Sequence, residues 1–529
     1  MAIKFSSKLA NETYDAIIIG SGLGGLTLAA LMAKEGKKPL VLERHYEPGG
    51  FTHTFKRTGG YNWDVGVHYV GRVDNEKAFL RRAFDYITDG NLQWASMGEV
   101  YDKAIFGEEE YDFVIGVKNQ IEILSARFPG EEAAIRKYYK LVKTVNAKVN
   151  FFFGERVLSL GWSKSLGKYI RRGFYKYADR TTYEVLKSLT SNEKLIAVLC
   201  AQFGNYGSPP KRSSFVIHAM VVGHYLYGGN YPVGGSDKIY KHILPVIQKA
   251  GGQVMIRAEV EKIIVKNHKA IGVQMVNGEE LFAKNIISNA GAWNTYMELL
   301  PQDLKLPFSA KEDLQKVKAS TANMGLFIGL NGSDEELKLP KHNYWIYDGY
   351  DIDADLEECV RNPHKDPPMA YVSFPSAKDP EWPINYPGKA TVQVISLANY
   401  EWFGRWEDER WMKRGEEYVN FKDSIKEGML KKLFKIAPQV KDKIEVCEVS
   451  SPLTTKHFAN YKRGEIYGLE HTPERFRLNW LRAKTPVKNL YMTGQDVITV
   501  GVGGALFSGI ITGAAMMKKN FISKINKGI

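Results

Sequence analysis

Gly20-Ser21-Gly22-Leu23-Gly24-Gly25 is the stretch that decides the fold of this 529-residue chain. It directly follows a short apolar run at residues 14–19, and residues 26–35 after it have the pattern of a helix. A second apolar run, residues 39–42, ends at Glu43. A strand, a glycine turn, a helix and a second strand that ends in an acidic residue are typical of a dinucleotide-binding βαβ unit.

The glycines have separate roles in such a unit. Gly20 makes the tight turn, Gly22 lets the backbone approach a pyrophosphate, and Gly25 packs the helix on the strand. We expect Glu43 to accept hydrogen bonds from the adenosine ribose, whereas Arg44 is either a phosphate ligand or a surface charge. NAD would satisfy this argument as well as FAD.

The end of the chain distinguishes the two cofactors. A short apolar run ends in Thr493-Gly494-Gln495-Asp496, and a glycine-rich apolar segment follows it. A carboxylate beside a second helix N-terminus binds hydroxyls rather than phosphate, as the ribityl chain of a flavin requires. We therefore predict FAD.

With these motifs the sequence resembles the FAD-dependent carotenoid desaturase and isomerase superfamily, which is related to the amine oxidases. The resemblance covers residues 14–517, and its narrower motifs are most similar to those of the retinol saturases. The motifs are GSGLGG, the E-R-x-x-x-P-G-G run at 43–50, His53-Thr54-Phe55, GVHYVG at 66–71, YPVGGS at 231–236, Pro452-Leu453-Thr454 and TGQD.

The resemblance also implies a set of cofactor contacts. They are Gly20, Gly22, Leu23, Gly24 and Gly25 at the pyrophosphate, Glu43 at the ribose, Arg44, Gly50 and Thr52 at the phosphates or flavin, the backbone of Val260 at the adenine, Asn289 beneath the cofactor, and Gly494, Asp496, Gly503 and Ala505 around the flavin.

A flavin saturase needs a proton donor in addition to a hydride. His68 is the first candidate, because it follows a strand-like run soon after the PGG turn and because histidine titrates near physiological pH. The alternative is a buried, hydrogen-bonded structural histidine. Tyr69 is the second candidate, with aromatic packing as its alternative. Six further side chains could line the pocket but are more often structural: His224, Tyr225, His457, Glu465, Tyr467 and His471.

The composition changes along the chain indicate two discontinuous domains. We predict an α/β, doubly wound, Rossmann-like FAD-binding domain from residues 1–75, 228–301 and 484–529. Residues 76–227 and 302–483 form a mixed α+β domain that binds the substrate and faces the membrane.

The chain has a formal net charge of +13, which is compatible with nucleic acid, an anionic membrane surface or solubility alone. No nucleic-acid-binding motif accompanies the charge, so we expect no nucleic-acid partner. Residues 161–176 interleave aromatic and basic side chains, as in an interfacial anchor, although a solvated helix face has the same composition. We do not expect residues 17–33 or 497–517 to span a membrane, and the first residues lack the apolar core of a signal peptide.

The three cysteines are far apart in sequence and predict neither a disulfide framework nor a metal site. This usage favours a reducing compartment, and we expect a protein on the cytoplasmic side, soluble or bound to a membrane surface.

These observations predict an oxidoreductase that saturates a carbon–carbon double bond of a lipophilic polyene or isoprenoid substrate. The sequence has no second strand-GxGxxG-helix unit, so electrons must come from an external donor, or go to an external acceptor. The alternatives are a carotenoid desaturase or isomerase and, in another class, a non-catalytic prenyl or lipid escort similar to the GDI proteins.

Overall fold

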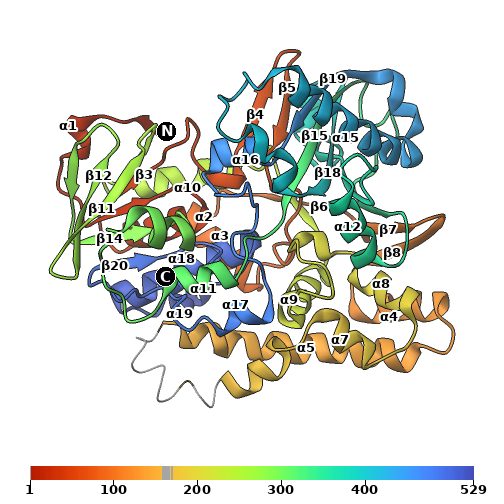
Figure 1. The fold of residues 1–529 in the computed structure, drawn as a ribbon, viewed down its shortest axis with the longest axis horizontal. Coiled ribbons are helices and arrows are strands. Elements are labelled where there is room, and N and C mark those ends of the chain that lie inside the picture. Colours follow the sequence, from red (N-terminus) through yellow and green to blue (C-terminus); the bar gives the residue numbers. More distant parts are fainter. Residues whose placement is uncertain (1, 158–166, 168–170, 529) are drawn as a thin grey trace.

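The computed structural model describes residues 2–157, 167 and 171–528 (Figure 1). A six-stranded sheet lies on the left of the figure, and each pair of neighbouring strands in it is parallel. Across the sheet the strands are β1 (Ile3–Lys4), β10 (Gln253–Ile256), β3 (Pro39–Leu42), β2 (Ala16–Ile19), β14 (Asn285–Ser288) and β20 (Leu490–Met492). β2 and β3 are completely buried, which explains their continuous apolar sequences. The predicted Rossmann-like sheet is confirmed.

Three helices pack together against this sheet. α2 (Leu23–Lys34) lies between α10 (Lys238–Lys249) and α18 (Gly501–Met517). α2 begins at Leu23, earlier than the predicted residue 26, because Gly24 and Gly25 belong to its first turn. Its N-cap residue is Gly22, which offers no side chain to the first amide groups of the helix.

A three-stranded antiparallel sheet packs near β14. It consists of β11 (Val260–Lys266), β12 (Lys269–Met275) and β13 (Glu280–Phe282), in this order. The apolar runs at residues 253–257, 259–265, 270–276 and 285–291 predict four successive strands. They correspond to β10, β11, β12 and β14, whereas β13 has no counterpart in the prediction.

A seven-stranded mixed sheet forms the other side of the molecule, on the right of Figure 1. The strands are β19 (Ile444–Ser450), β15 (Ala322–Asn331), β18 (Lys389–Ala398), β17 (Met369–Ser373), β16 (Asn343–Tyr347), β7 (Val100–Phe106) and β8 (Glu109–Val114). Side chains alternate between its two faces. In β15, Met324, Leu326 and Ile328 pack in one core with side chains of α15 (Gly415–Ile436).

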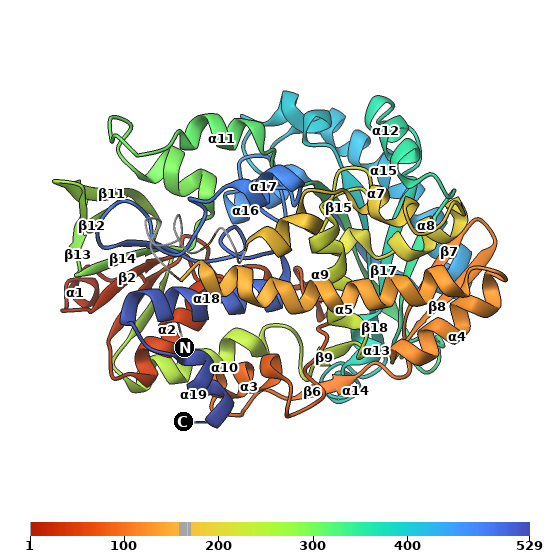
Figure 2. The ribbon, with the colours of Figure 1, turned by 90° about the horizontal axis from the view of Figure 1, so that it is seen from below.

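A layer of helices joins the two sheets. Figure 2 shows α5 (Glu132–Glu155) running from the region of α18 to the β7–β8 hairpin, with α9 (Phe215–Tyr225) packed on it. The remaining elements are α1 (Ser7–Ala10), β4 (Thr54–Arg57), β5 (Tyr61–Asp64), α3 (Phe79–Thr88), β6 (Trp94–Ser96), α4 (Val117–Arg127), α7 (Thr182–Lys187), α8 (Glu193–Cys200), β9 (Asn230–Pro232), α11 (Ala310–Lys316), α12 (Ile352–Arg361), α13 (Pro375–Lys378), α14 (Trp382–Asn385), α16 (Pro452–Ala459), α17 (Pro473–Arg477) and α19 (Phe521–Lys527).

The structure bears on one of the two membrane-related predictions, whereas the other concerns residues that are mostly not described. Among the described residues, no single helix has the length and apolar character needed to cross a bilayer; α18 and α19 meet that criterion only as a pair bent by 119°. The predicted interfacial anchor at 161–176 lies largely outside the described residues, which omit 158–166 and 168–170.

Candidate functional site

A cavity of about 1450 Å³ connects the two sheets. Its lining includes Gly20, Glu43 and Asn289 at the carboxyl ends of the parallel strands, and Trp345 and Tyr371 of the seven-stranded sheet. Ligand pockets usually measure about 300–1,000 Å³. This cavity therefore has room for more than one ligand.

The glycine turn forms one end of the cavity. Gly20 has a φ of +93°, in the left-handed region that side chains disfavour. A Cβ atom on Gly25 would lie 2.5 Å from the carbonyl oxygen of Gly20, so only glycine lets α2 pack this closely on the turn. The start of α2 thus opens toward the cavity with positive potential, as an anion-binding site requires.

The carboxylate of Glu43 is fixed beside this turn. Its Oε2 accepts hydrogen bonds from the backbone N and the Oγ of Ser21, at 2.8 and 2.7 Å. Its Oε1 accepts one from the backbone N of His45, at 2.8 Å. Arg44 is bound to Glu259 (Nε to Oε1, 3.2 Å) and to the carbonyl of His457 (3.1 Å). Both predicted residues line the cavity.

Most of the predicted cofactor residues come together in this lining, although they span almost the whole chain. They are Gly20, Gly22, Leu23, Gly24, Glu43, Arg44, Gly50, Thr52, Val260, Asn289, Gly494 and Ala505. Gly25, Asp496 and Gly503 are not among the lining residues.

The carboxylate of Asp496 is bound to backbone groups of the protein. Its Oδ2 accepts a hydrogen bond from the backbone N of Ala292 (2.7 Å), and its Oδ1 accepts one from the backbone N of Leu469 (2.9 Å). The guanidinium of Arg475 lies 4.0 Å from Oδ1. In this structure the carboxylate joins two loops behind the cavity wall.

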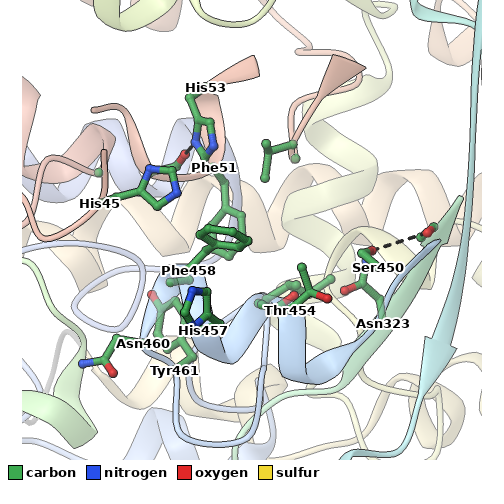
Figure 3. A pocket seen from close by; sticks show the side chains of 18 of the residues that line it. His45, Phe51, His53, Asn323, Ser450, Thr454, His457, Phe458, Asn460 and Tyr461 are labelled. Carbon is green, nitrogen blue, oxygen red and sulfur yellow. Dashed lines mark hydrogen bonds between the residues drawn. The ribbon is translucent and has the colours of Figure 1, made fainter. Parts of the chain in front are cut away.

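Aromatic and histidine side chains form the middle of the cavity (Figure 3). The rings of His45 and His53 are 4.8 Å apart, and that of Phe458 is 5.2 Å from His45. Phe51 stacks on Tyr461 at 6.3 Å. Burial, and then the neighbouring His53, lower the pKa of His45 to about 4, so His45 is neutral at physiological pH.

The far end of the cavity is a largely apolar sheet face. It is opposite the α15 face, since side chains of alternate positions point to opposite sides of a strand. Its residues are Phe327 of β15, Trp345 of β16, Met369 and Tyr371 of β17, and Ile395 and Leu397 of β18. Such a surface fits a long hydrocarbon ligand.

His68 lies in the cavity wall near this face. Burial, followed by the charge of Lys378, lowers its pKa to about 3, so the imidazole is neutral at physiological pH. Its Nδ1 is buried and has no hydrogen-bond partner. The hydroxyl of Tyr371 is also buried without a partner, and the two rings are 5.4 Å apart. Two unpaired polar atoms in one wall are what a ligand with hydrogen-bonding groups would complete.

Tyr69, the second candidate, is held behind the wall. Its hydroxyl donates to Oδ2 of Asp102 (2.8 Å) and accepts from Nδ2 of Asn205 (3.0 Å). Burial raises its pKa well above the usual value. Tyr69 is not among the lining residues, and its hydrogen bonds and burial favour a structural role.

Lys378 was not identified from the sequence. Its buried ammonium donates to the carbonyl oxygen of His68 (3.1 Å), to Oγ of Ser373 (2.7 Å) and to Oδ1 of Asn343. Asn343 in turn donates to Oδ1 of Asp102 at 2.8 Å. The dipeptide His68-Tyr69 is therefore held from both ends, by Lys378 and Asp102. Burial lowers the pKa of Lys378 to about 7.

Of the six other side chains considered from the sequence, some line the cavity and some do not. His457 and Tyr467 line the cavity, whereas His224, Tyr225, Glu465 and His471 are not among its lining residues. Tyr371 lies in the apolar strand β17 and Lys378 is the last residue of the short helix α13, and the sequence carries no separate signal at either position. Within the described part of the chain, no group of three or more His, Cys, Asp or Glu side chains could hold a metal ion.

Comparison with known proteins places this site in a family context. Residues 18–87 match the family model of an NAD(P)-binding Rossmann-like domain. The chain is 39% identical to an all-trans-retinol 13,14-reductase of Danio rerio, over 98% of this chain and 88% of that protein. It is 33% identical to an inactive all-trans-retinol 13,14-reductase of the same species, with the same coverage. Identity to a prolycopene isomerase of Daucus carota is 25%, over 95% and 79% of the two chains.

Solved structures agree on the fold. An oxidoreductase from Methanosarcina mazei has a TM-score of 0.63 at 18% identity, with 95% of this chain and 100% of that chain covered. A putrescine oxidase has a TM-score of 0.63 at 14% identity, with coverage of 96% and 100%. At these identities the likeness concerns the fold alone.

The lowered pKa of Lys378 predicts a pH-dependent contribution to stability. In the folded state the pKa is about 7, below the 10.5 of a free lysine, so the unfolded chain binds the extra proton between these values. Stability from this group therefore rises with pH in that window, by on the order of 1 kcal/mol per pH unit. Urea unfolding of wild type and Lys378→Met at pH 7, 8 and 9 should show their difference growing in favour of the wild type. Lys311→Met, at an exposed lysine, is the control; a Lys378→Met difference that does not change with pH would contradict the assignment.

Proposed function

The chain belongs to the all-trans-retinol 13,14-reductase family, and on this premise we propose that it is an FAD-dependent oxidoreductase that saturates one carbon–carbon double bond of a retinoid-like polyene. The observation that carries the proposal is the continuity of the cavity. It joins the dinucleotide-binding glycine turn to an apolar sheet face, so a flavin and a long polyene can be held end to end.

The residues at the glycine end fit FAD. A Cβ atom on Gly22 or Gly24 would lie only 2.8 or 2.9 Å from the side chain of Asn289, so these two positions need glycine. The N-terminus of α2 suits a pyrophosphate, and the fixed carboxylate of Glu43 suits ribose hydroxyls. We propose these groups, with Arg44, Thr52 and Val260, as the FAD site. The position of Asp496 supports a role in shaping the loops around the flavin.

Saturation of an alkene needs a hydride on one carbon and a proton on the other. Reduced FAD supplies the hydride. We propose that the proton passes through His68, which lies in the wall with its Nδ1 unpaired. A neutral imidazole is a weak acid, but an anionic ligand within about 4–6 Å would raise the pKa of His68. Lys378 would hold the residue in place through its carbonyl group. Tyr371, with its unpaired hydroxyl, is the alternative donor.

Saturation is favoured over isomerisation because the reductases are more similar to this chain than the isomerase, at 39% against 25% identity. One relative that is 33% identical to this chain is an inactive all-trans-retinol 13,14-reductase, so activity must be measured on this protein itself. The same cavity would serve a carotenoid desaturase or isomerase. A lipid escort without flavin has no use for the fixed Glu43 carboxylate. An external reductant, not a second nucleotide domain, would supply the electrons.

The close packing at Gly25 gives a direct test of the cofactor site. Gly25→Ala should lower the flavin content of the purified protein severalfold, because the new Cβ would lie 2.5 Å from the oxygen of Gly20. Gly154→Ala, where no atom lies within 4 Å of the new Cβ, is the matched control and should retain wild-type flavin absorbance. Equal flavin content in the two variants would count against this site.

The reaction is tested by reducing the bound flavin anaerobically and adding all-trans-retinol. We expect the absorbance of the oxidised flavin to return as the polyene is reduced. His68→Gln should slow this reoxidation by about 10²–10⁴-fold, the usual size of a general-acid contribution, with flavin still bound. His268→Gln, at an exposed histidine, is the control. Wild-type kinetics in His68→Gln would remove His68 from the mechanism, and Tyr371→Phe would then be measured.

A further inference from the structure

Arg414 is a buried cation without a counterion. It precedes α15, lines the cavity and is only 8% exposed. Its Nε is buried with no hydrogen-bond partner. No hydrogen bond or ion pair joins its guanidinium to another residue of the described chain; its contact is with the ring of Tyr418, 5.3 Å away. Buried charges are costly unless they are paired, so an unpaired arginine in a cavity wall marks a place for an anion.

A second cation lies on the same face of α15. Lys422 follows Tyr418 by four residues on α15, so these two side chains share one face of the helix, and Arg414, the residue before α15, reaches the same ring. The ammonium of Lys422 is 5.0 Å from the centre of the Tyr418 ring and donates to the carbonyl of Val449 at 3.1 Å. Lys422 also lines the cavity. Two cations therefore share one aromatic ring at this end.

The acidic side chains nearby do not neutralise this pair. Glu448 lines the cavity but is bound to Arg57, Nε to Oε1, at 2.7 Å. Glu416 also lines it, and it is exposed. Asp423, on α15, is paired with Lys426 at 2.8 Å. The charges of Asp423 and Glu448 act on Lys422 at a distance, but none of the three acids forms an ion pair with Arg414 or Lys422 within the described structure. The local charge available to a ligand is positive.

The lining changes from apolar to polar toward these cations. The face built from β16, β17 and β18 is apolar, whereas β19 and α16 contribute Ser450 and Thr454, and Asn323 lies beside them (Figure 3). Tyr418 donates to or accepts from Ser451 at 2.6 Å, which fixes the ring beneath the cations. The cavity thus suits a ligand with an apolar chain and a charged end.

We propose that Arg414 and Lys422 form an oxyanion subsite that binds the carboxylate at the end of an apolar polyene. A guanidinium matches a carboxylate with two parallel hydrogen bonds, and burial strengthens them. The dinucleotide phosphates have their own site at the start of α2. This inference rests on the proposed function, because it names the end group of the polyene that the same cavity takes.

Two retinoids that differ only at the end group test the subsite. We would titrate the flavin-loaded protein at pH 8 with all-trans-retinoic acid and all-trans-retinol, following the quenching of tryptophan fluorescence. The wild type should bind the acid at least about tenfold more tightly, as expected for hydrogen bonds to a charged group. Arg414→Gln should remove this preference and leave retinol affinity unchanged, and Arg414→Lys should keep part of it.

Arg405→Gln is the matched control, because Arg405 is exposed, pairs with Glu417 at 3.7 Å and is not among the lining residues. Equal affinity for the two retinoids, binding of neither, or an equal loss of both in Arg414→Gln would overturn the subsite. A loss of flavin in Arg414→Gln would overturn it too, by assigning the arginine to a cofactor phosphate. Binding is measured without turnover, so a protein that prefers the acid but reduces no polyene would refute the proposed function and not the subsite.

Discussion

The close approach of two glycine-containing segments to Asn289 is the constraint on which the rest of the site depends. A Cβ atom on Gly22, Gly24 or Gly494 would lie 2.8 to 2.9 Å from the side chain of Asn289, which follows β14. These segments are more than two hundred residues apart from one another along the chain. Their contact brings the ends of β2, β14 and β20 together and opens the start of α2 toward the cavity. A substitution here would alter the cofactor site and the parallel sheet together.

Beyond this contact, burial governs the chemistry that the cavity can support. His45 and His68 are both neutral at physiological pH because burial lowers their pKa values to about 4 and 3. Lys378, with a pKa of about 7, lies behind the wall and fixes the backbone of His68. A bound anionic ligand would change these protonation states most strongly near His68. In the proposed mechanism, proton supply through His68 would therefore depend on ligand binding, because no charged acid is held ready at this position.

The sequence predicted the parts of this molecule whose signals are local. The strand, glycine turn and helix at residues 14–35 and four strands between 253 and 291 follow from apolar runs and turn residues, and the structure contains them. Motifs also predicted most of the cavity lining at the cofactor end. The seven-stranded sheet, Tyr371, Lys378 and Arg414 could not be predicted in the same way, because their roles arise from contacts between distant segments. Asp496 illustrates the limit: its place in the chain was recognised, but its partners Ala292 and Leu469 depend on tertiary structure.

The central claim is that this protein adds hydrogen across one carbon–carbon double bond of a polyene bound in the cavity. The most direct measurement is the mass of the product formed when the reduced, flavin-loaded protein acts on all-trans-retinol without oxygen. A product heavier by two hydrogen atoms is the result that the account predicts. A product lighter by two hydrogen atoms would indicate desaturation, an unchanged mass with a new isomer would indicate isomerisation, and either would contradict it.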